Sequence, residues 1–241
     1  MSLCFAIAKV ALLWLEYTPF LVKSECDIVA HSSLPPARPR NPRRATRDTA
    51  PRAWQRMLSG RRLDLLDPAA IDIEIDDIAL GLSRVARWNG QTRGEHGFSV
   101  AQHSLIVEDI CGYIQRDLAV PYRLMALLHD APEYVIGDMI SPFKAALGLD
   151  YKRFESHLEQ AIHIRFGLPA VMPGPVKTLI KQADHACAYF EATQLAGFTD
   201  AEARTYFGEP PAGYVLDITP LPAMAASEAF VARFDELIAR L

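Results

Sequence analysis

At residues 127–133 the chain reads Leu-Leu-His-Asp-Ala-Pro-Glu, at the end of an apolar stretch with helical spacing. Leu124 and Leu128 lie on the buried side of that stretch, and Pro121 suits the first turn of a helix. We therefore predict a helix over residues 122–134. It carries a histidine and an aspartate side by side, and both side chains bind divalent cations in proteins.

Further helices are predicted on both sides of this stretch. Apolar periodicity places them over residues 76–88, 99–114 with Ser99 as N-cap, 151–166, 175–195 and 225–241, with a non-helical segment over 208–222. Strand signals are few, and the alternation of Ile71, Ile73 and Ile75 indicates one short extended segment. We expect an all-α domain, a compact multi-helix bundle formed by helix-on-helix packing.

The composition limits the classes of function. The chain has 241 residues, half of them hydrophobic, which suffices for one domain with a sizeable core. Its net charge of -4 gives no general attraction to nucleic acid or to anionic membranes. The four cysteines, Cys4, Cys26, Cys111 and Cys187, show no Cys-x-x-Cys spacing, which argues against a disulfide framework and a thiolate zinc site. A cytoplasmic setting is expected.

The first 60 residues are expected to form an extension outside the domain, which covers residues 61–241. Residues 3–22 are apolar but contain Lys9 and Glu16, and residues 35–56 are rich in proline and arginine. Three interpretations stay open: a membrane anchor or signal, a basic arm for nucleic acid, or a non-essential extension. We favour the last, because charges interrupt the apolar segment and no aromatic residues alternate with the arginines.

Four residues on predicted helices have the chemistry of a metal site: His103, His129, Asp130 and Asp184. An inward histidine alone is more often a hydrogen-bonded core residue. A carboxylate on a buried helical face, however, requires a cation or a hydrogen-bond network. Neighbouring residues on a helix point about 100° apart. His129 and Asp130 can therefore share one metal only if the helix end directs both inward, as Pro132 would allow.

The order His…His-Asp…Asp on helices resembles the HD-domain metal-dependent phosphohydrolases, in particular their YfbR-like 5'-nucleotidase branch. The resemblance covers residues 61–241. The segments that carry it are Arg87-Trp88, Ser99-Val100-Ala101-Gln102-His103-Ser104, His129-Asp130-Ala131-Pro132-Glu133, Gly137-Asp138-Met139-Ile140-Ser141-Pro142-Phe143-Lys144 and Lys181-Gln182-Ala183-Asp184.

This resemblance implies a role for each site residue. One divalent cation (manganese, cobalt, zinc, iron or magnesium, which the ligands do not distinguish) would be held by His103, His129, Asp130 and Asp184. The catalytic residues would be Glu133, which positions or deprotonates the attacking water, together with Asp130 and Arg87. The substrate would contact Arg87 through its phosphate, Trp88 through its sugar or base, and His103, Asp138 and Ser141 in the pocket. Lys144 and Lys181 could add positive charge for the phosphate, but we interpret them as surface lysines.

The expected function is metal-dependent release of phosphate from (deoxy)nucleoside 5'-monophosphates. Gln102 replaces a glutamate that often precedes the first ligand histidine, and the loop between Trp88 and His103 differs from the nucleotidase branch, so the substrate stays open. Tyr134 stands where guanosine tetraphosphate hydrolases have an aspartate, and no Gly-Tyr-Pro of the cyclic-dinucleotide phosphodiesterases is present.

Two alternatives remain: hydrolysis of another nucleotide, either a deoxynucleoside triphosphate or a signalling nucleotide, and a non-catalytic metal- or nucleotide-binding sensor. The expected partner is a small phosphorylated molecule, with no nucleic acid or membrane. A homodimer is left open.

Overall fold

We describe the fold from a computed structural model that covers residues 53–139 and 149–241. The apolar segment 3–22, most of the Pro/Arg-rich segment, and Ser141 and Lys144 of the expected pocket lie outside these residues. Among the helices of the described part, none is both long and apolar enough to cross a membrane.

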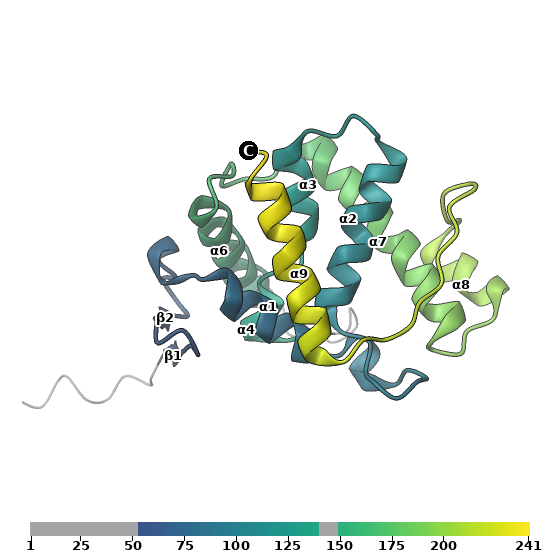
Figure 1. Cartoon of the computed structure of the whole chain (residues 1–241), viewed down its shortest axis with the longest axis horizontal. Helices are drawn as coiled ribbons and strands as arrows, with labels where there is room; N and C mark the ends of the chain where they lie inside the picture. Colours follow the sequence, from purple (N-terminus) through teal and green to yellow (C-terminus); the bar gives the residue numbers. More distant parts are fainter. Residues whose placement is uncertain (1–52, 140–148) are drawn as a thin grey trace, which may run out of the picture. The chain divides into compact units, whose positions relative to one another are not determined.

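The described chain is mainly helical, which confirms the all-α prediction (Figure 1). Its elements are β1 (Trp54–Arg56), β2 (Arg62–Asp64), η2 (Ala70–Asp72), α1 (Ile75–Arg84), η3 (Arg87–Gly90), α2 (Val100–Ile114), α3 (Val120–Leu127), α4 (Glu133–Ile136), α6 (Leu149–Arg165), α7 (Gly174–Gln194), α8 (Asp200–Phe207) and α9 (Ala223–Ile238). The strands form a two-stranded antiparallel hairpin in which Gln55 lies opposite Leu63. Only its first strand, β1, lies before residue 61, where the domain was expected to begin.

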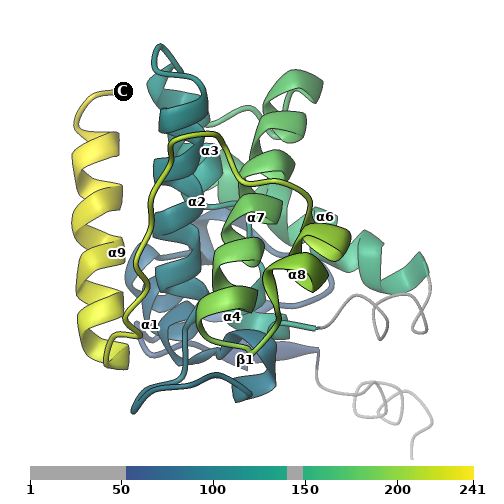
Figure 2. The same ribbon diagram turned by 90° about the vertical axis from the view of Figure 1, so that its right-hand side faces the viewer.

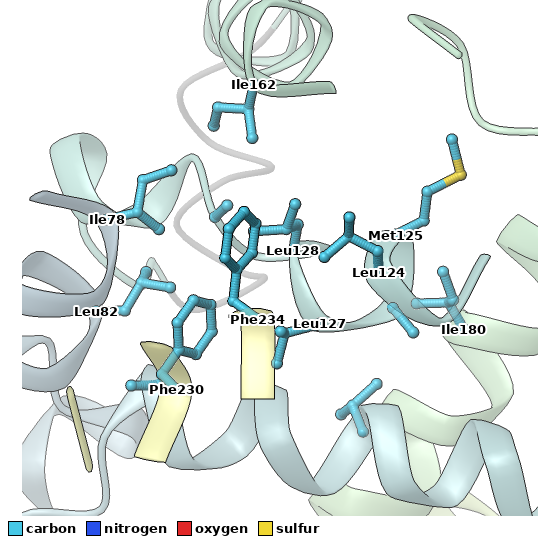
Figure 3. Packing of buried hydrophobic residues seen from close by; sticks show 14 of the residues in the cluster. Ile78, Leu82, Leu124, Met125, Leu127, Leu128, Ile162, Ile180, Phe230 and Phe234 are labelled. Atoms are coloured by element: carbon cyan, nitrogen blue, oxygen red, sulfur yellow. The ribbon is translucent and has the colours of Figure 1, made fainter. Parts of the chain in front are cut away.

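Helix α2 lies in the middle of the bundle, with α9 on one side and α7 on the other (Figure 2). Helix α3 also contacts α2 and α9, while α1 packs against α9 and α4. Apolar side chains from these helices and from α6 meet in one core (Figure 3); among them are Ile78, Leu82, Leu124, Leu127, Leu128, Ile162, Phe230 and Phe234. Helix α2 therefore packs directly on α7, and the site described below lies where these two helices meet.

Several predicted elements are confirmed. Ser99 caps α2, since its hydroxyl accepts a hydrogen bond from the backbone N–H of Gln102 at 3.2 Å. Helices α6 and α7 begin and end within about two residues of the predicted bounds, which is the usual uncertainty of helix ends. Helix α9 begins two residues and ends three residues before its predicted bounds. Residues 208–222 are not helical.

The region before α2 differs from the prediction. Residues 70–72 form a short 3-10 helix instead of an extended segment, and α1 already begins at Ile75. Only Ile73 of the three alternating isoleucines is fully buried, whereas Ile71 is 70% exposed. The alternation therefore did not mark a strand with one face in the core. Helix α1 ends at Arg84, so Trp88 belongs to the following turn.

The helix predicted over residues 122–134 is two helices. Helix α3 ends at Leu127, Leu128 has non-helical angles (φ −96°, ψ 9°), and α4 begins at Glu133. Pro132 has no N–H to donate, and its ring would collide with the carbonyl group of Leu128 in a continuous helix. His129 and Asp130 therefore lie in a break between two helices.

Candidate metal centre

Three of the four expected ligands converge. His103, His129 and Asp130 each offer a ligand atom within 4.8 Å of the other two. One carboxylate oxygen of Asp130, Oδ2, lies 3.2 Å from His129 Nε2 and 3.5 Å from His103 Nε2. His103 is fully buried on α2. The break between α3 and α4 thus directs two adjacent side chains toward the same histidine of a different helix.

Asp184 approaches the same point from α7. Its Oδ1 lies 3.3 Å from Nε2 of His103, although Asp184 is not within 4.8 Å of all members of the group of three. Burial tends to raise the pKa of Asp184, but the neighbouring imidazole of His103 lowers it below the ordinary value. Asp184 is therefore a carboxylate, as a metal ligand must be.

The two histidines are oriented by their other ring nitrogens. Nδ1 of His129 lies 2.8 Å from the backbone carbonyl oxygen of Ala126, to which it can only donate. Nδ1 of His103 lies 2.6 Å from Oε1 of Glu191. When each Nδ1 carries the proton, each Nε2 presents a lone pair to the space between the ligands, which is the usual arrangement of metal-binding histidines.

The residues present fit a divalent cation. Nε2 of His103 and Nε2 of His129 are buried, and neither forms a hydrogen bond within the described part of the chain, although carboxylate oxygens surround them. Burial and Arg87 tend to lower the pKa of His103, but Glu191 and Asp130 raise it well above the usual value, so this position stabilises positive charge. Two imidazoles and two carboxylates suit manganese, iron, cobalt or zinc.

Glu191 connects His103 to Arg87 and Trp88. It is fully buried on α7, and its Oε1 accepts from His103 while its Oε2 accepts from Trp88 Nε1 at 2.7 Å and Arg87 Nε at 3.3 Å. Burial tends to raise its pKa, but Arg87 and His103 hold the pKa well below the ordinary range. Sequence analysis assigned no role to Glu191. The available signal was its place seven residues after Asp184, on the same side of the helix.

A second group of potential ligands, His103, Cys187 and Glu191, is accounted for by hydrogen bonds. The thiol of Cys187 donates to Oε1 of Glu191 at 3.1 Å, next to the bond from His103. Burial raises the pKa of Cys187 to about 12. Without a cation the residue is therefore a thiol near neutral pH, the form that donates this hydrogen bond. Cys187 and Glu191 therefore hold His103 on the Nδ1 side of its ring, opposite Nε2.

Arg87 is held in place by a strained turn. The next two residues, Trp88 (φ 57°, ψ 27°) and Asn89 (φ 51°, ψ 32°), are both left-handed, which non-glycine residues rarely adopt and which concentrates at functional sites. The backbone N–H of Arg87 donates to the carbonyl oxygen of Phe98 at 2.8 Å, next to the start of α2. This pairing places Arg87 beside the helix that carries His103.

The guanidinium of Arg87 faces a ring of carboxylates. Besides Glu191, it lies 3.6 Å from Asp138, 3.9 Å from Asp130 and 4.0 Å from Asp184, measured between the nearest nitrogen and oxygen atoms. The structure therefore brings Arg87 and Asp138 to the predicted metal ligands. These contacts are longer than bidentate ion pairs, so the guanidinium can turn toward an anion without losing a strong partner.

The other expected residues lie around this centre. Trp88 is half-buried, and its ring packs against Phe198 and Phe207 with centroids 5.5 and 5.8 Å away. Glu133 is buried at the first position of α4, four residues after His129. Ser141 lies outside the described residues.

Comparison with known proteins places the chain in a family. It is 54% identical over 194 residues to the uncharacterized protein RCAP_rcc00048 of Rhodobacter capsulatus, covering 79% of this chain and 98% of the relative. It is 33% identical over 166 residues to the uncharacterized protein YfdR of Escherichia coli, covering 69% of this chain and 85% of the relative. No family model matches the chain. The chain belongs to the family of these two proteins.

Proposed function

We propose that this protein is a metal-dependent phosphohydrolase that releases phosphate from (deoxy)nucleoside 5'-monophosphates. The observation that carries the proposal is the convergence of His103, His129 and Asp130, with Asp184 beside them, around two buried Nε2 atoms that have no hydrogen bond in the described chain. The resemblance of the same residues to the HD-domain phosphohydrolases, which rests on sequence motifs alone, supports the same class of reaction.

The ligands and Arg87 have complementary tasks in such a reaction. A divalent cation held by these ligands would lower the pKa of a bound water and polarise a phosphoryl oxygen. Arg87 would bind the phosphate, since a planar guanidinium suits two of its oxygens. Glu191 would fix Arg87 through Nε, which leaves the terminal nitrogens to face the substrate.

Glu133 is the residue proposed to handle the proton of the attacking water. It is buried at the first position of α4, four residues after His129 and directly after the break that carries His129 and Asp130. A carboxylate beside the ligands would accept a proton from the attacking water. Trp88, which is anchored by its indole N–H, would form the wall beside the sugar or base.

The test is a panel of nucleoside mono- and triphosphates assayed for phosphate release with manganese, cobalt, zinc, iron and magnesium. We expect turnover of monophosphates that chelator treatment removes and metal restores. Asp130→Asn should lower the rate by at least about a hundredfold, because it removes a ligand that both histidines contact.

The matched control is Asp117→Asn, which makes the same change at an exposed position after α2. It should keep the full rate. Full activity of Asp130→Asn would contradict the proposal. Metal binding without turnover of any phosphate ester would replace the enzyme with a metal- or nucleotide-binding sensor.

A further inference from the structure

A hollow on the surface between α7 and α8 is not used by the site described above. Its volume is about 520 Å³, and it is lined by Lys177, Thr178, Lys181, Gln182, His185, Phe207, Gly208 and Glu209. The two helices lie side by side in both views (Figures 1 and 2). A hollow of this volume is within the range of small-molecule sites.

The charged residues that line the hollow are mainly lysines. Neither Lys177 nor Lys181 forms an ion pair within residues 53–139 and 149–241, and both are exposed. The acidic residue of the lining, Glu209, is already paired with Arg204. Thr178 and Gln182 add polar groups along the same side of α7. This lining therefore favours an anion.

The hollow adjoins the candidate metal centre. Lys181 and Lys177 precede Asp184 by three and seven residues, which places all three on adjoining parts of one helical face. On the opposite wall, Phe207 packs edge-on against Trp88, the residue that donates to Glu191.

The charge of Lys177 also acts on Glu159 of α6. Burial raises the pKa of Glu159; Lys177 and His129 act against this shift, and Asp130 adds to it. Sequence analysis interpreted Lys181 as a surface lysine, and the hollow gives it a different setting.

We propose that this hollow binds a second phosphate, so that the site turns over simple monophosphates but prefers a nucleotide with at least one phosphate beyond the one at the metal centre. This inference rests on the proposed function. The additional phosphate can belong to a 5'-phosphate chain or to a 3'-phosphate, since both present the same anion to Lys177 and Lys181. Phe207 would contact the apolar part of the ligand.

The test uses the full chain and a double variant, Lys177→Gln with Lys181→Gln, beside a control, Arg116→Gln, that removes an exposed positive charge outside the hollow. The first measurement is calorimetric binding of inorganic pyrophosphate to chelator-treated protein. We expect about tenfold weaker binding by the double variant and no change in the control.

The second measurement compares kcat/KM for a nucleoside 5'-monophosphate, a 3',5'-bisphosphate and a 5'-triphosphate. The ratio of one multiply phosphorylated substrate to the monophosphate should fall about tenfold in the double variant, and the substrate affected identifies where the second phosphate is attached. Unchanged pyrophosphate affinity and unchanged ratios would overturn the inference while monophosphate turnover keeps the proposed function. Pyrophosphate binding that needs both lysines, without turnover of any ester, would retain the anion site and refute the proposed function.

Discussion

Glu191 joins the candidate ligand His103 to Arg87 and Trp88 through one buried carboxylate. Its carboxylate receives hydrogen bonds from His103, Trp88 and Arg87. A partner of this kind fixes the tautomer of a ligand histidine and raises its basicity. If the centre holds a metal, the affinity for the cation should therefore depend on a residue that does not touch it.

We expect Glu191→Gln to weaken binding of manganese or cobalt about 10–100-fold, because the neutral amide holds the proton on Nδ1 of His103 less firmly. Competition with a chelator of known affinity measures the change. Glu228→Gln, at an exposed position of α9, is the control and should bind the metal as the wild type does. Equal affinity of Glu191→Gln and wild type would refute the positioning role.

His163 gives a prediction about pH that does not involve the candidate centre. It is fully buried on α6, and burial lowers its pKa, a shift that the backbone groups of Ala170 and Pro169 only partly oppose. The unfolded chain therefore takes up the proton at a higher pH than the folded one. This residue should lower the free energy of unfolding as the pH falls below about 6.5.

The variant His163→Leu should consequently lose less stability than the wild type between pH 7 and pH 5. Urea unfolding at a series of pH values measures this difference. His157→Leu on the exposed side of the same helix should follow the wild-type profile. Parallel profiles for His163→Leu and wild type would show that the unfolding equilibrium is not linked to His163.

At the scale of residues, the sequence could predict the candidate ligands because few side-chain types bind divalent cations, and the structure brings His103, His129 and Asp130 together. Glu191 could not, because a supporting carboxylate has no fixed spacing from the ligand that it orients. The left-handed backbone of Trp88 and Asn89 could not be predicted from the sequence either. Positive φ is uncommon for any residue other than glycine, so the residue types alone do not predict it.

The short helix α4 depends on close contact with α1. Gly81 lies where a Cβ atom would come within 2.7 Å of the Cβ atom of Tyr134 and 3.0 Å of its carbonyl oxygen. Tyr134 directly follows Glu133, so the spacing between these helices also sets the position of the proposed catalytic carboxylate. Only glycine allows this approach.

Gly81→Ala should therefore lower the free energy of unfolding by about 1–3 kcal/mol, because the overlap outweighs the gain of about 1 kcal/mol that alanine brings to a helix interior. Urea unfolding followed by circular dichroism provides the measurement. Gly174→Ala is the matched control, since a Cβ atom there meets nothing within 4 Å. A stability of Gly81→Ala equal to or above that of wild type would show that α1 and α4 separate at little cost.

At the scale of elements, periodicity predicted the long helices but not how they are interrupted. The apolar spacing of residues 122–134 continues through the break, because Leu128 stays buried although the backbone leaves the helix. Pro132 was the signal, and it acts on the residue four positions earlier. Helix α8 was not predicted, yet its start carries a capping box in which Thr199 and Glu202 satisfy each other's backbone N–H groups.

Across the whole molecule, α2 is joined to its neighbours by polar contacts as well as by the core. Glu108, buried on α2, forms ion pairs with Arg123 of α3 at 2.5 Å and with Arg233 of α9 at 2.9 Å. His103, one turn and a fraction earlier on the same helix, meets Asp130 of the break and Asp184 of α7. The candidate centre thus links His103 and Asp184, which are 81 residues apart in the sequence.

A cation at this centre should therefore stabilise the whole domain. The ligands come from separate segments, so the unfolded chain cannot offer the assembled site, and binding adds to the free energy of unfolding. At a free metal concentration one hundred times the dissociation constant, the gain is about 2.7 kcal/mol. We expect the midpoint of thermal unfolding to fall when a chelator removes manganese from the protein and to recover when manganese is returned. Asp184→Asn, which replaces the ligand contributed by α7, should show a much smaller shift, whereas Asp117→Asn should shift as the wild type does. A midpoint that is independent of manganese in protein shown to bind the ion would mean that the cation does not bridge these helices.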